Sequence, residues 1–291
     1  MIDKIHINYI EKLLDNNKIT FSKLLSNSFG INCLKLKSLD NKHYIVKFYE
    51  KKESQFNAIK SESKNLTYLN NLKINYFPRV LSNNEDYLIM SYIENNNITP
   101  NEIKMDLLGA IVKLHSFHNN FFGFDFDTQI GGLKQKNNKS KNWVDFYRNY
   151  RLGYIFEIIN KSKPMEYSIN KKIELLLKNL ETYIPNNPTP SLLHGDLWAG
   201  NILFNNSRFV GLIDPGSFYG HNELEVAYLT WFNPEFIGSN FLSKYNEILK
   251  IDKEYNNYEP IYQLYYSLLN VYLWDRAYIK DVKRLLDIII V

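Results

Sequence analysis

The sequence contains almost no cysteine and no long apolar run. Cys33 is the only cysteine among the 291 residues, which excludes an internal disulfide and a cysteine-based zinc site and favours a reducing compartment. The apolar run at 288–291 is far shorter than the roughly 18 residues that a membrane helix needs. Residues 1–17 lack the apolar stretch of an export signal. We therefore predict a cytoplasmic protein with no membrane partner.

An excess of charge of one sign is also missing. Lys and Arg total 35 against 31 Asp and Glu, which gives a net charge of +4, and this small, dispersed excess does not indicate a nucleic-acid partner. The lysines at 134, 136, 139 and 141 predict a solvated surface rather than an anion site. Hydrophobic residues make up 45% of the chain and aromatic residues 15%. This composition excludes wholesale disorder and can fill large cores.

The N-terminal third is poor in glycine but carries clear strand signals. Segments 33–37 and 43–49 predict a β-hairpin, because each is rich in apolar, β-branched or aromatic residues and turn residues separate them. A helical stretch at about 52–70 and two further strands at 79–82 and 86–93 follow. The sequence therefore predicts a small β-rich lobe with one helix.

Beyond about residue 100 the apolar pattern becomes helical. In 102–118 the apolar residues recur at the spacing of one helix face. We expect further helices at about 142–160, at 168–184 and from 222 to the end, with a β stretch at 191–218. A β-rich region followed by a helical one predicts an α+β, two-lobed fold, divided into residues 1–94 and 95–291.

The most informative stretch is LLHGDLWAGNILF at 192–204. It contains the pattern H-x-D-x-x-x-x-N, with Asp196 and Asn201, and Asp214 follows at the end of a second apolar run. These are the parts that phosphoryl transfer uses. Asp196 is the candidate base that accepts the hydroxyl proton, and Asn201 and Asp214 are the candidate Mg²⁺ ligands. The alternative is that the two carboxylates are ordinary turn residues at strand ends.

The N-terminal region supplies matching candidates for ATP binding. Lys47 lies in the apolar strand IVKFY, where a buried cation needs a partner, and Glu62 on the following helix is the candidate, with Glu53 on the same segment. The alternative for Lys47 is an exposed strand face. We also expect Met90 and Tyr92, in the strand at 86–93, to contact the nucleotide.

The loop that would cover the phosphates departs from the usual pattern. Gly30 is the only glycine before Gly109, so this part of the chain has no G-x-G-x-x-G motif. Residues 27–30 would have to cover the nucleotide with one glycine and small polar residues. Either the backbone amides suffice, or nucleotide binding is weak.

The strings LLHGDLWAGNILF and IDPGSFYGHNELEVA (213–227) resemble the fructosamine kinase family, within the aminoglycoside phosphotransferase and protein-kinase-like superfamily. The similarity extends to 122–135, 262–270 and 278–286, and covers about residues 20–290. The resemblance implies a protein-kinase-like fold. It also implies ATP- and Mg²⁺-dependent phosphorylation of a sugar hydroxyl in ketosamines, either small molecules or protein-bound ribulosamine and fructosamine, as in protein deglycation.

The resemblance also suggests which residues would meet the acceptor sugar. Trp198 either stacks on the sugar face or is a core residue, and Phe218, Tyr219 and His221 would shape the acceptor side. Members of the family commonly carry a histidine in the C-terminal helix where this chain has Asn270.

Two alternatives to the ketosamine kinase stay open at this point. One is a kinase of the same fold that phosphorylates another small hydroxyl compound, such as an aminoglycoside or a choline-like molecule. The other is a catalytically weak nucleotide-binding pseudoenzyme, for which the glycine-poor loop is the only support. The oligomeric state is not predicted.

Overall fold

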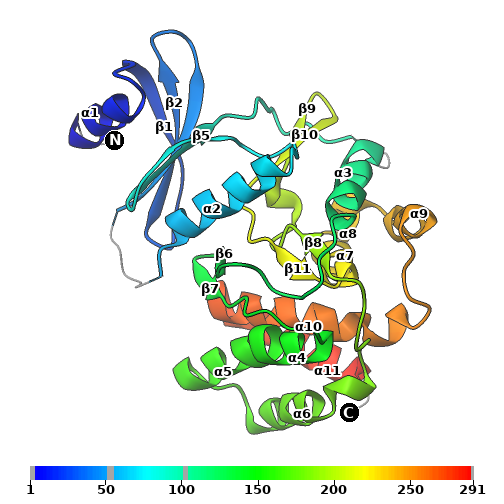
Figure 1. The fold of residues 1–291 in the computed structure, drawn as a ribbon. Helices are drawn as coiled ribbons and strands as arrows, with labels where there is room; N and C mark the ends of the chain where they lie inside the picture. Colours follow the sequence, from blue (N-terminus) through cyan, green and yellow to red (C-terminus); the bar gives the residue numbers. More distant parts are fainter. Residues whose placement is uncertain (1–3, 51–55, 101–103, 290–291) are drawn as a thin grey trace. The chain divides into compact units, whose positions relative to one another are not determined.

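The computed structural model describes residues 4–50, 56–100 and 104–289 (Figure 1). The chain divides into two units, one formed by Met1–Thr99 and Leu203–Pro215, the other by Pro100–Ile202 and Gly216–Val291. The N-terminal segment of the first unit thus ends at residue 99, five residues beyond the boundary predicted at 94. The unit also includes a second segment, residues 203–215. This segment joins it through backbone hydrogen bonds, since Phe204 O accepts from the amides of residues 96 and 97 and Ser207 N donates to Ile98 O.

The first unit contains a five-stranded antiparallel sheet in the order β1-β2-β3-β5-β4. Its strands are β1 (Ile19–Ser28), β2 (Ile31–Ser38), β3 (His43–Tyr49), β4 (Val80–Asn83) and β5 (Tyr87–Ser91). Two helices, α1 (Lys4–Leu13) and α2 (Ala58–Asn71), accompany the sheet, and β9 (Ile202–Asn205) and β10 (Arg208–Leu212) form a separate hairpin. The expected hairpin of β2 and β3, the helix α2 and the strands β4 and β5 are confirmed.

The two helices lie on opposite faces of this sheet (Figure 1). Ile10 of α1 packs with apolar side chains of one face, including Leu36, Val46 and Phe48. Because successive side chains of a strand alternate between faces, Lys47 lies on the other face, where Glu62 of α2 meets it. The alternation in β3 therefore positions the lysine.

The helix α1 and the strand β1 were not predicted from the sequence. Nearly every residue of β1 is exposed, so the strand lacks the alternation that reveals a half-buried strand. The pairing of β1 with β2 fixes it instead, at the edge of the sheet.

The second unit is mostly helical. Its helices are α3 (Met105–His115), α4 (Trp143–Tyr147), α5 (Gly153–Ser162), α6 (Tyr167–Lys178), α7 (Asn222–Phe232), α8 (Pro234–Ile237), α9 (Phe241–Ile248), α10 (Tyr255–Leu273) and α11 (Ile279–Ile288). Short helical turns are the π segment η1 (Arg148–Leu152) and the 3₁₀ segments η2 (Leu180–Thr182), η3 (Ala199–Asn201) and η4 (Arg276–Tyr278). Two small antiparallel pairs complete it: β6 (Thr128–Ile130) with β7 (Leu133–Gln135), and β8 (Ser191–Leu193) with β11 (Phe218–Gly220).

Helix α10 is the centre of this unit and runs behind α4 and α5 in Figure 1. Most of its residues are buried, among them Tyr258, Tyr262, Tyr265 and Tyr266. Most of the buried aromatic side chains of the described residues lie in this unit. None of the helices in the described ranges is both long and apolar enough to cross a membrane.

Two predictions for this unit need correction. The single helix expected at 142–160 is divided by η1, where a Cβ on Gly153 would lie 2.3 Å from Arg148 O, so glycine permits the widened turn. The polar loop expected after α3 contains the hairpin of β6 and β7, joined by Gly131 and Gly132 with φ of 52° and 77°.

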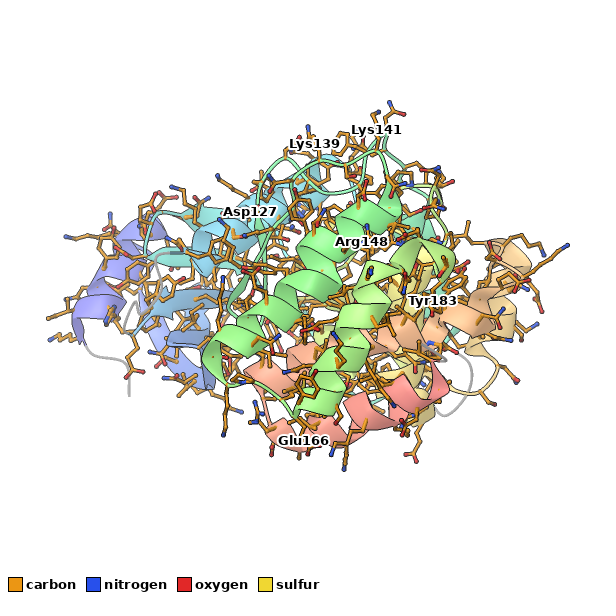
Figure 2. All side chains as sticks on the ribbon, turned by 90° about the horizontal axis from the view of Figure 1, so that it is seen from below. Asp127, Lys139, Lys141, Arg148, Glu166 and Tyr183 are labelled. Carbon is orange, nitrogen blue, oxygen red and sulfur yellow. The ribbon has the colours of Figure 1, made fainter. Side chains whose placement is uncertain are left out.

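The lysines near this hairpin lie at the surface of the unit, as expected. Figure 2 shows Lys139 and Lys141 at the periphery, and Lys139 Nζ lies 2.6 Å from the carboxylate of Asp125. Lys134 pairs with Asp127 at 2.8 Å. Neighbouring carboxylates therefore offset part of this positive charge.

Candidate active site

In the first unit, Lys47 is held between two carboxylates. Its Nζ lies 2.8 Å from both carboxylate oxygens of Glu62 and 2.6 Å from Oδ1 of Asp214. The Lys47–Glu62 pair expected from the sequence is therefore present. Glu53, the other acidic residue considered, lies outside the described residues.

Burial and charge act in opposite directions on Lys47, whose side chain is only 10% exposed. Burial favours the neutral amine, but the charges of Asp214 and Glu62 outweigh it and raise the pKa of Lys47. Burial raises the pKa of Glu62, although Lys47 opposes this. The ammonium group is thus a fixed cation of the kind that can bind nucleotide phosphates.

Asp214 combines an unusual backbone with a partly exposed carboxylate. Its φ of 57° lies in the left-handed region, which is uncommon for a residue with a side chain and is often found at functional sites. Its side chain is 40% exposed and one oxygen is bound by Lys47. The carboxylate therefore keeps access to solvent while Lys47 orients it.

In the second unit, Glu225 of α7 fixes the backbone of the His-Gly-Asp loop. Its Oε2 accepts from His194 N at 3.0 Å and its Oε1 from Gly195 N at 2.7 Å, while His115 Nε2 lies 3.0 Å from Oε2. Burial by itself raises the pKa of Glu225, but His115, His194 and the amide of Gly195 together lower it. A buried carboxylate with this many donors is a firm anchor for the loop.

Glycine is required in this loop because two backbone segments pass very close to each other. Gly195 has φ of 89°, and a Cβ there would lie 2.1 Å from Gly216 O. Gly216 N in turn donates to His194 O at 2.9 Å. Gly195 and Gly216 thus lie directly against each other within the second unit.

The residues after the loop orient Asp196 and Trp198. Asn201 Nδ2 donates to Asp196 O at 2.8 Å and to Asp196 Oδ2 at 3.1 Å. The indole of Trp198 lies directly over Gly200, where a Cβ would come within 2.3 Å of the ring. The spacing of D-L-W-A-G-N therefore has a packing reason as well as a chemical one.

Asp196 and Trp198 line a cavity of about 490 Å³ within the second unit. This volume is in the range of small-molecule sites. Its wall is largely aromatic and is built from the β6–β7 turn, the His-Gly-Asp loop, α7, α10 and η4: Ile130, Gly131, Tyr228, Phe232, Tyr266, Leu269, Asn270, Leu273, Trp274, Asp275 and Tyr278. Asp196 is thus placed against a space that can hold an acceptor.

The other three residues expected on the acceptor side are buried in packing and are not among those that line the cavity. The guanidinium of Arg151 lies 3.7 Å from the ring centroid of Phe218. Tyr219 pairs with Gly123 through backbone hydrogen bonds. His221 Nδ1 lies 2.8 Å from Tyr262 Oη, which also accepts from the indole of Trp143.

The other residues expected near the nucleotide lie in or next to the sheet of the first unit. Gly30, with φ of 73°, lies in the β1–β2 turn, and its carbonyl accepts from Glu50 N at 2.9 Å. Met90 is buried in β5, opposite Ile45. Tyr92 follows β5, and Lys35 Nζ lies 3.7 Å above its ring.

Several residues that the structure brings to the site were not predicted from the sequence. Glu225 is one of them, since nothing in the sequence indicates its bonds to the amides of His194 and Gly195. Tyr228 and Tyr266 of the cavity wall are stacked with ring centroids 3.8 Å apart. In the sequence they look like core residues of amphipathic helices, so no local signal distinguishes them.

Comparisons with known proteins identify the chain's relatives. The family model described as fructosamine kinase matches residues 10–291. A probable ketoamine kinase of Enterococcus faecium is 32% identical over 69% of this chain and 71% of its own length. The chloroplastic protein-ribulosamine 3-kinase of Arabidopsis thaliana is 28% identical over 69% of this chain and 61% of its own.

Solved structures show the same fold. A candidate fructosamine-3-kinase from Thermobifida fusca has a TM-score of 0.84 at 19% identity, over 99% of each chain. An ADP-bound aminoglycoside phosphotransferase has a TM-score of 0.66 at 20% identity, over 99% of this chain and 98% of that one. The predicted protein-kinase-like fold is confirmed. Since the family model spans nearly the whole chain, this protein belongs to the fructosamine kinase family, whose members are ATP-dependent phosphotransferases that act on a sugar hydroxyl.

Proposed function

We propose that this protein phosphorylates a sugar hydroxyl of a ketosamine with ATP, using Asp196 as the base. The observation that carries the proposal is that Asp196 and Trp198 line an aromatic cavity of about 490 Å³. An aromatic wall suits the C–H faces of a sugar, and the carboxylate provides the proton acceptor next to it.

The proposed step asks little covalent chemistry of the protein. The acceptor hydroxyl attacks the γ-phosphorus of ATP, the bond to the β-phosphate oxygen breaks, and Asp196 takes the hydroxyl proton. Asn201 holds the Asp196 carboxylate through its amide N–H. The base is therefore positioned before the acceptor binds, which lowers the cost of reorganisation.

The residues present fit a magnesium ion. When its Nδ2 donates to Asp196, Asn201 leaves its Oδ1 free of hydrogen bonds within the described residues, and Asp214 offers a half-exposed carboxylate. Both are hard oxygen donors, which Mg²⁺ prefers. We propose that Asn201 and Asp214 hold Mg²⁺, which would offset the negative charge of the phosphates. Lys47 is proposed to bind a phosphate, and Glu62 to orient the side chain of Lys47. Gly30, Met90 and Tyr92 are proposed to contact the nucleotide.

The acceptor is proposed to be a ribulosamine or fructosamine, either as a small molecule or on a protein side chain. The names of the relatives from Enterococcus faecium and Arabidopsis thaliana support this class. Trp198 is proposed to stack on the sugar, whereas Phe218, Tyr219 and His221 would act only through the packing behind it. A cytoplasmic location stays a prediction that rests on the scarcity of cysteine.

The first test is ADP release from Mg-ATP with ribuloselysine and with fructoselysine. The Asp196→Asn variant serves as the blank, because it keeps the shape of the side chain and removes the base. We expect turnover with at least one ketosamine, and a fall of about 10²–10⁴-fold in the variant. Turnover only with an aminoglycoside or choline-like acceptor would overturn the acceptor class. An unchanged variant would overturn the role of Asp196.

A further inference from the structure

The wall of the acceptor cavity contains two buried side chains that each have one polar atom without a partner among the described residues. Tyr266 is 2% exposed and Asn270 is 5% exposed, and both line the cavity. Within the described residues, the hydroxyl of Tyr266 and Nδ2 of Asn270 form no hydrogen bond. Leaving a buried donor unpaired costs free energy, so such groups in a cavity wall indicate a polar ligand.

The hydroxyls of the other buried tyrosines of α10 have hydrogen-bond partners. Tyr262 bonds to Trp143 and His221, and the hydroxyl of Tyr255 donates to Glu259 at 3.1 Å. Tyr258 donates to Glu223. Tyr266 differs from these three in lying on the cavity, with its ring stacked on Tyr228. This stacking fixes the ring and hence the position of its hydroxyl.

The charge of the lining is the second observation. Asp196 and Asp275 are its two carboxylates, and the described residues that line the cavity include no lysine, arginine or histidine. Asp275 begins η4 by accepting from Ala277 N at 2.7 Å, and it forms no ion pair within the described ranges. Next to it, Trp274 is 63% exposed. An anionic and aromatic cavity favours an acceptor that carries a positive charge.

We infer that Tyr266 and Asn270 bind the hydroxyl groups of a polyhydroxy amine in this cavity, and that Asp275 binds its ammonium group. This inference rests on the proposed function, because it names the groups that select the acceptor of the same site. A ketosamine has both features, a chain of hydroxyls and a protonated secondary amine. A sugar phosphate or a sugar acid would meet two carboxylates and is disfavoured.

The variants Tyr266→Phe and Asn270→Leu test the hydroxyl contacts. Each approximately keeps the shape of the side chain and removes the polar atom that forms no hydrogen bond among the described residues. We expect an unchanged or higher thermal midpoint, an acceptor KM raised about 3- to 10-fold, and an unchanged KM for ATP. The matched control is Tyr255→Phe on the same helix, whose hydroxyl has a partner. It is expected to lower the midpoint and leave the acceptor KM unchanged.

Asp275→Asn tests the charge. We expect the KM for a ketosamine to rise about 2- to 5-fold at low salt, with a smaller effect at high salt. The KM for the corresponding N-acetylated ketosamine, which is neutral, is expected not to change. A control is Asp281→Asn on α11, outside the cavity lining.

The outcomes separate this inference from the proposed function. Wild-type turnover with ketosamine and wild-type KM in Tyr266→Phe and Asn270→Leu would overturn the inference and leave the function standing. If the wild type shows no turnover, ketosamine binding without nucleotide is titrated by calorimetry for the same variants. Weaker binding by the variants supports the inference even then, and no binding to the wild type overturns it.

Discussion

The His-Gly-Asp loop and the cavity wall beside it satisfy their polar groups in different ways. In the loop, Glu225 receives two backbone amides and a histidine, and Asn201 holds Asp196. In the wall, the hydroxyl of Tyr266 and Nδ2 of Asn270 have no partner among the described residues. Internal hydrogen bonds thus hold the groups that we propose to carry out the chemistry. The polar atoms that we propose to recognise the acceptor have no such bonds among the described residues.

The largest effect is expected where a fixed charge is removed. Lys47→Met takes away a buried cation and leaves Glu62 and Asp214 facing each other without it. We expect a loss of about 3–5 kcal/mol in the free energy of unfolding, because the buried carboxylate of Glu62 loses its cation. Urea unfolding measures this, and thermal shift with ATP measures nucleotide binding. Glu62→Gln with Lys47→Met should recover part of the loss. A single variant as stable as wild type would show that Lys47 is not fixed by these contacts.

Glu225→Gln tests the anchor of the loop. Glutamine offers one acceptor oxygen where two amides donate, so we expect a loss of about 1–3 kcal/mol in the free energy of unfolding. We also expect kcat to fall while the acceptor KM changes little, because the cavity wall is untouched.

The control for Glu225 is Glu174→Gln, an exposed residue of α6 that pairs with Lys171 at 3.5 Å. Its effect should stay within about 0.5 kcal/mol. A change in acceptor KM rather than kcat in Glu225→Gln would mean that loop and wall are not independent.

Gly200→Ala tests the position of Trp198. The added Cβ would meet the indole ring at 2.3 Å, so the ring must move away from its place on the cavity. We expect a loss of about 1–3 kcal/mol in stability and a higher acceptor KM. Gly109→Ala in α3 is the matched control, since its Cβ would meet nothing within 4 Å. It should stabilise the protein by about 0.5–1 kcal/mol. Equal effects of the two variants would contradict the packing of Trp198 on Gly200.

The smallest effect concerns His221, behind the wall. Burial, with the nearby His115, lowers the pKa of His221 to about 3. Since a histidine in the unfolded chain titrates near 6.5, the unfolded state binds more protons between these values, and stability falls as the pH drops below about 6.5. The decline from this group is at most about 1.4 kcal/mol per pH unit. Urea unfolding from pH 7.5 to 5 should show a shallower decline in His221→Gln. If the stability of wild type and of His221→Gln declined equally with falling pH, His221 would not be neutral in the folded protein.

Features that depend on a few neighbouring residues were predicted correctly from the sequence. The strands β2 and β3, Lys47 within β3, and the spacing from Asp196 to Asn201 were all visible, because alternation and short motifs act over a few residues. The predicted pairing of Lys47 with Glu62 is confirmed as well, since the two residues lie on a strand and on the next helix along the chain. In contrast, β1 carries no alternation, and the β6–β7 hairpin looked like a polar loop.

The cavity wall shows what the sequence could not provide. Asp196, Tyr228, Tyr266 and Asp275 come from four elements spread over eighty residues, and each looks ordinary in its own segment. The residues chosen instead, Phe218, Tyr219 and His221, follow the Asp-Pro-Gly motif closely in the sequence. In the structure these side chains are packed in the interior, where Arg151 contacts Phe218 and Tyr262 contacts His221.

The sequence by itself determined the family, the fold class and the chemistry expected of the His-Gly-Asp loop, because these depend on residue types at short, fixed spacings. Only the tertiary structure decided which side chains surround Asp196 and which of their polar atoms lack partners. Whether a buried hydroxyl is satisfied depends on groups far away in the chain. Tyr255 and Tyr266 look alike within α10, but one has Glu259 as its partner and the other faces a cavity that an acceptor can fill.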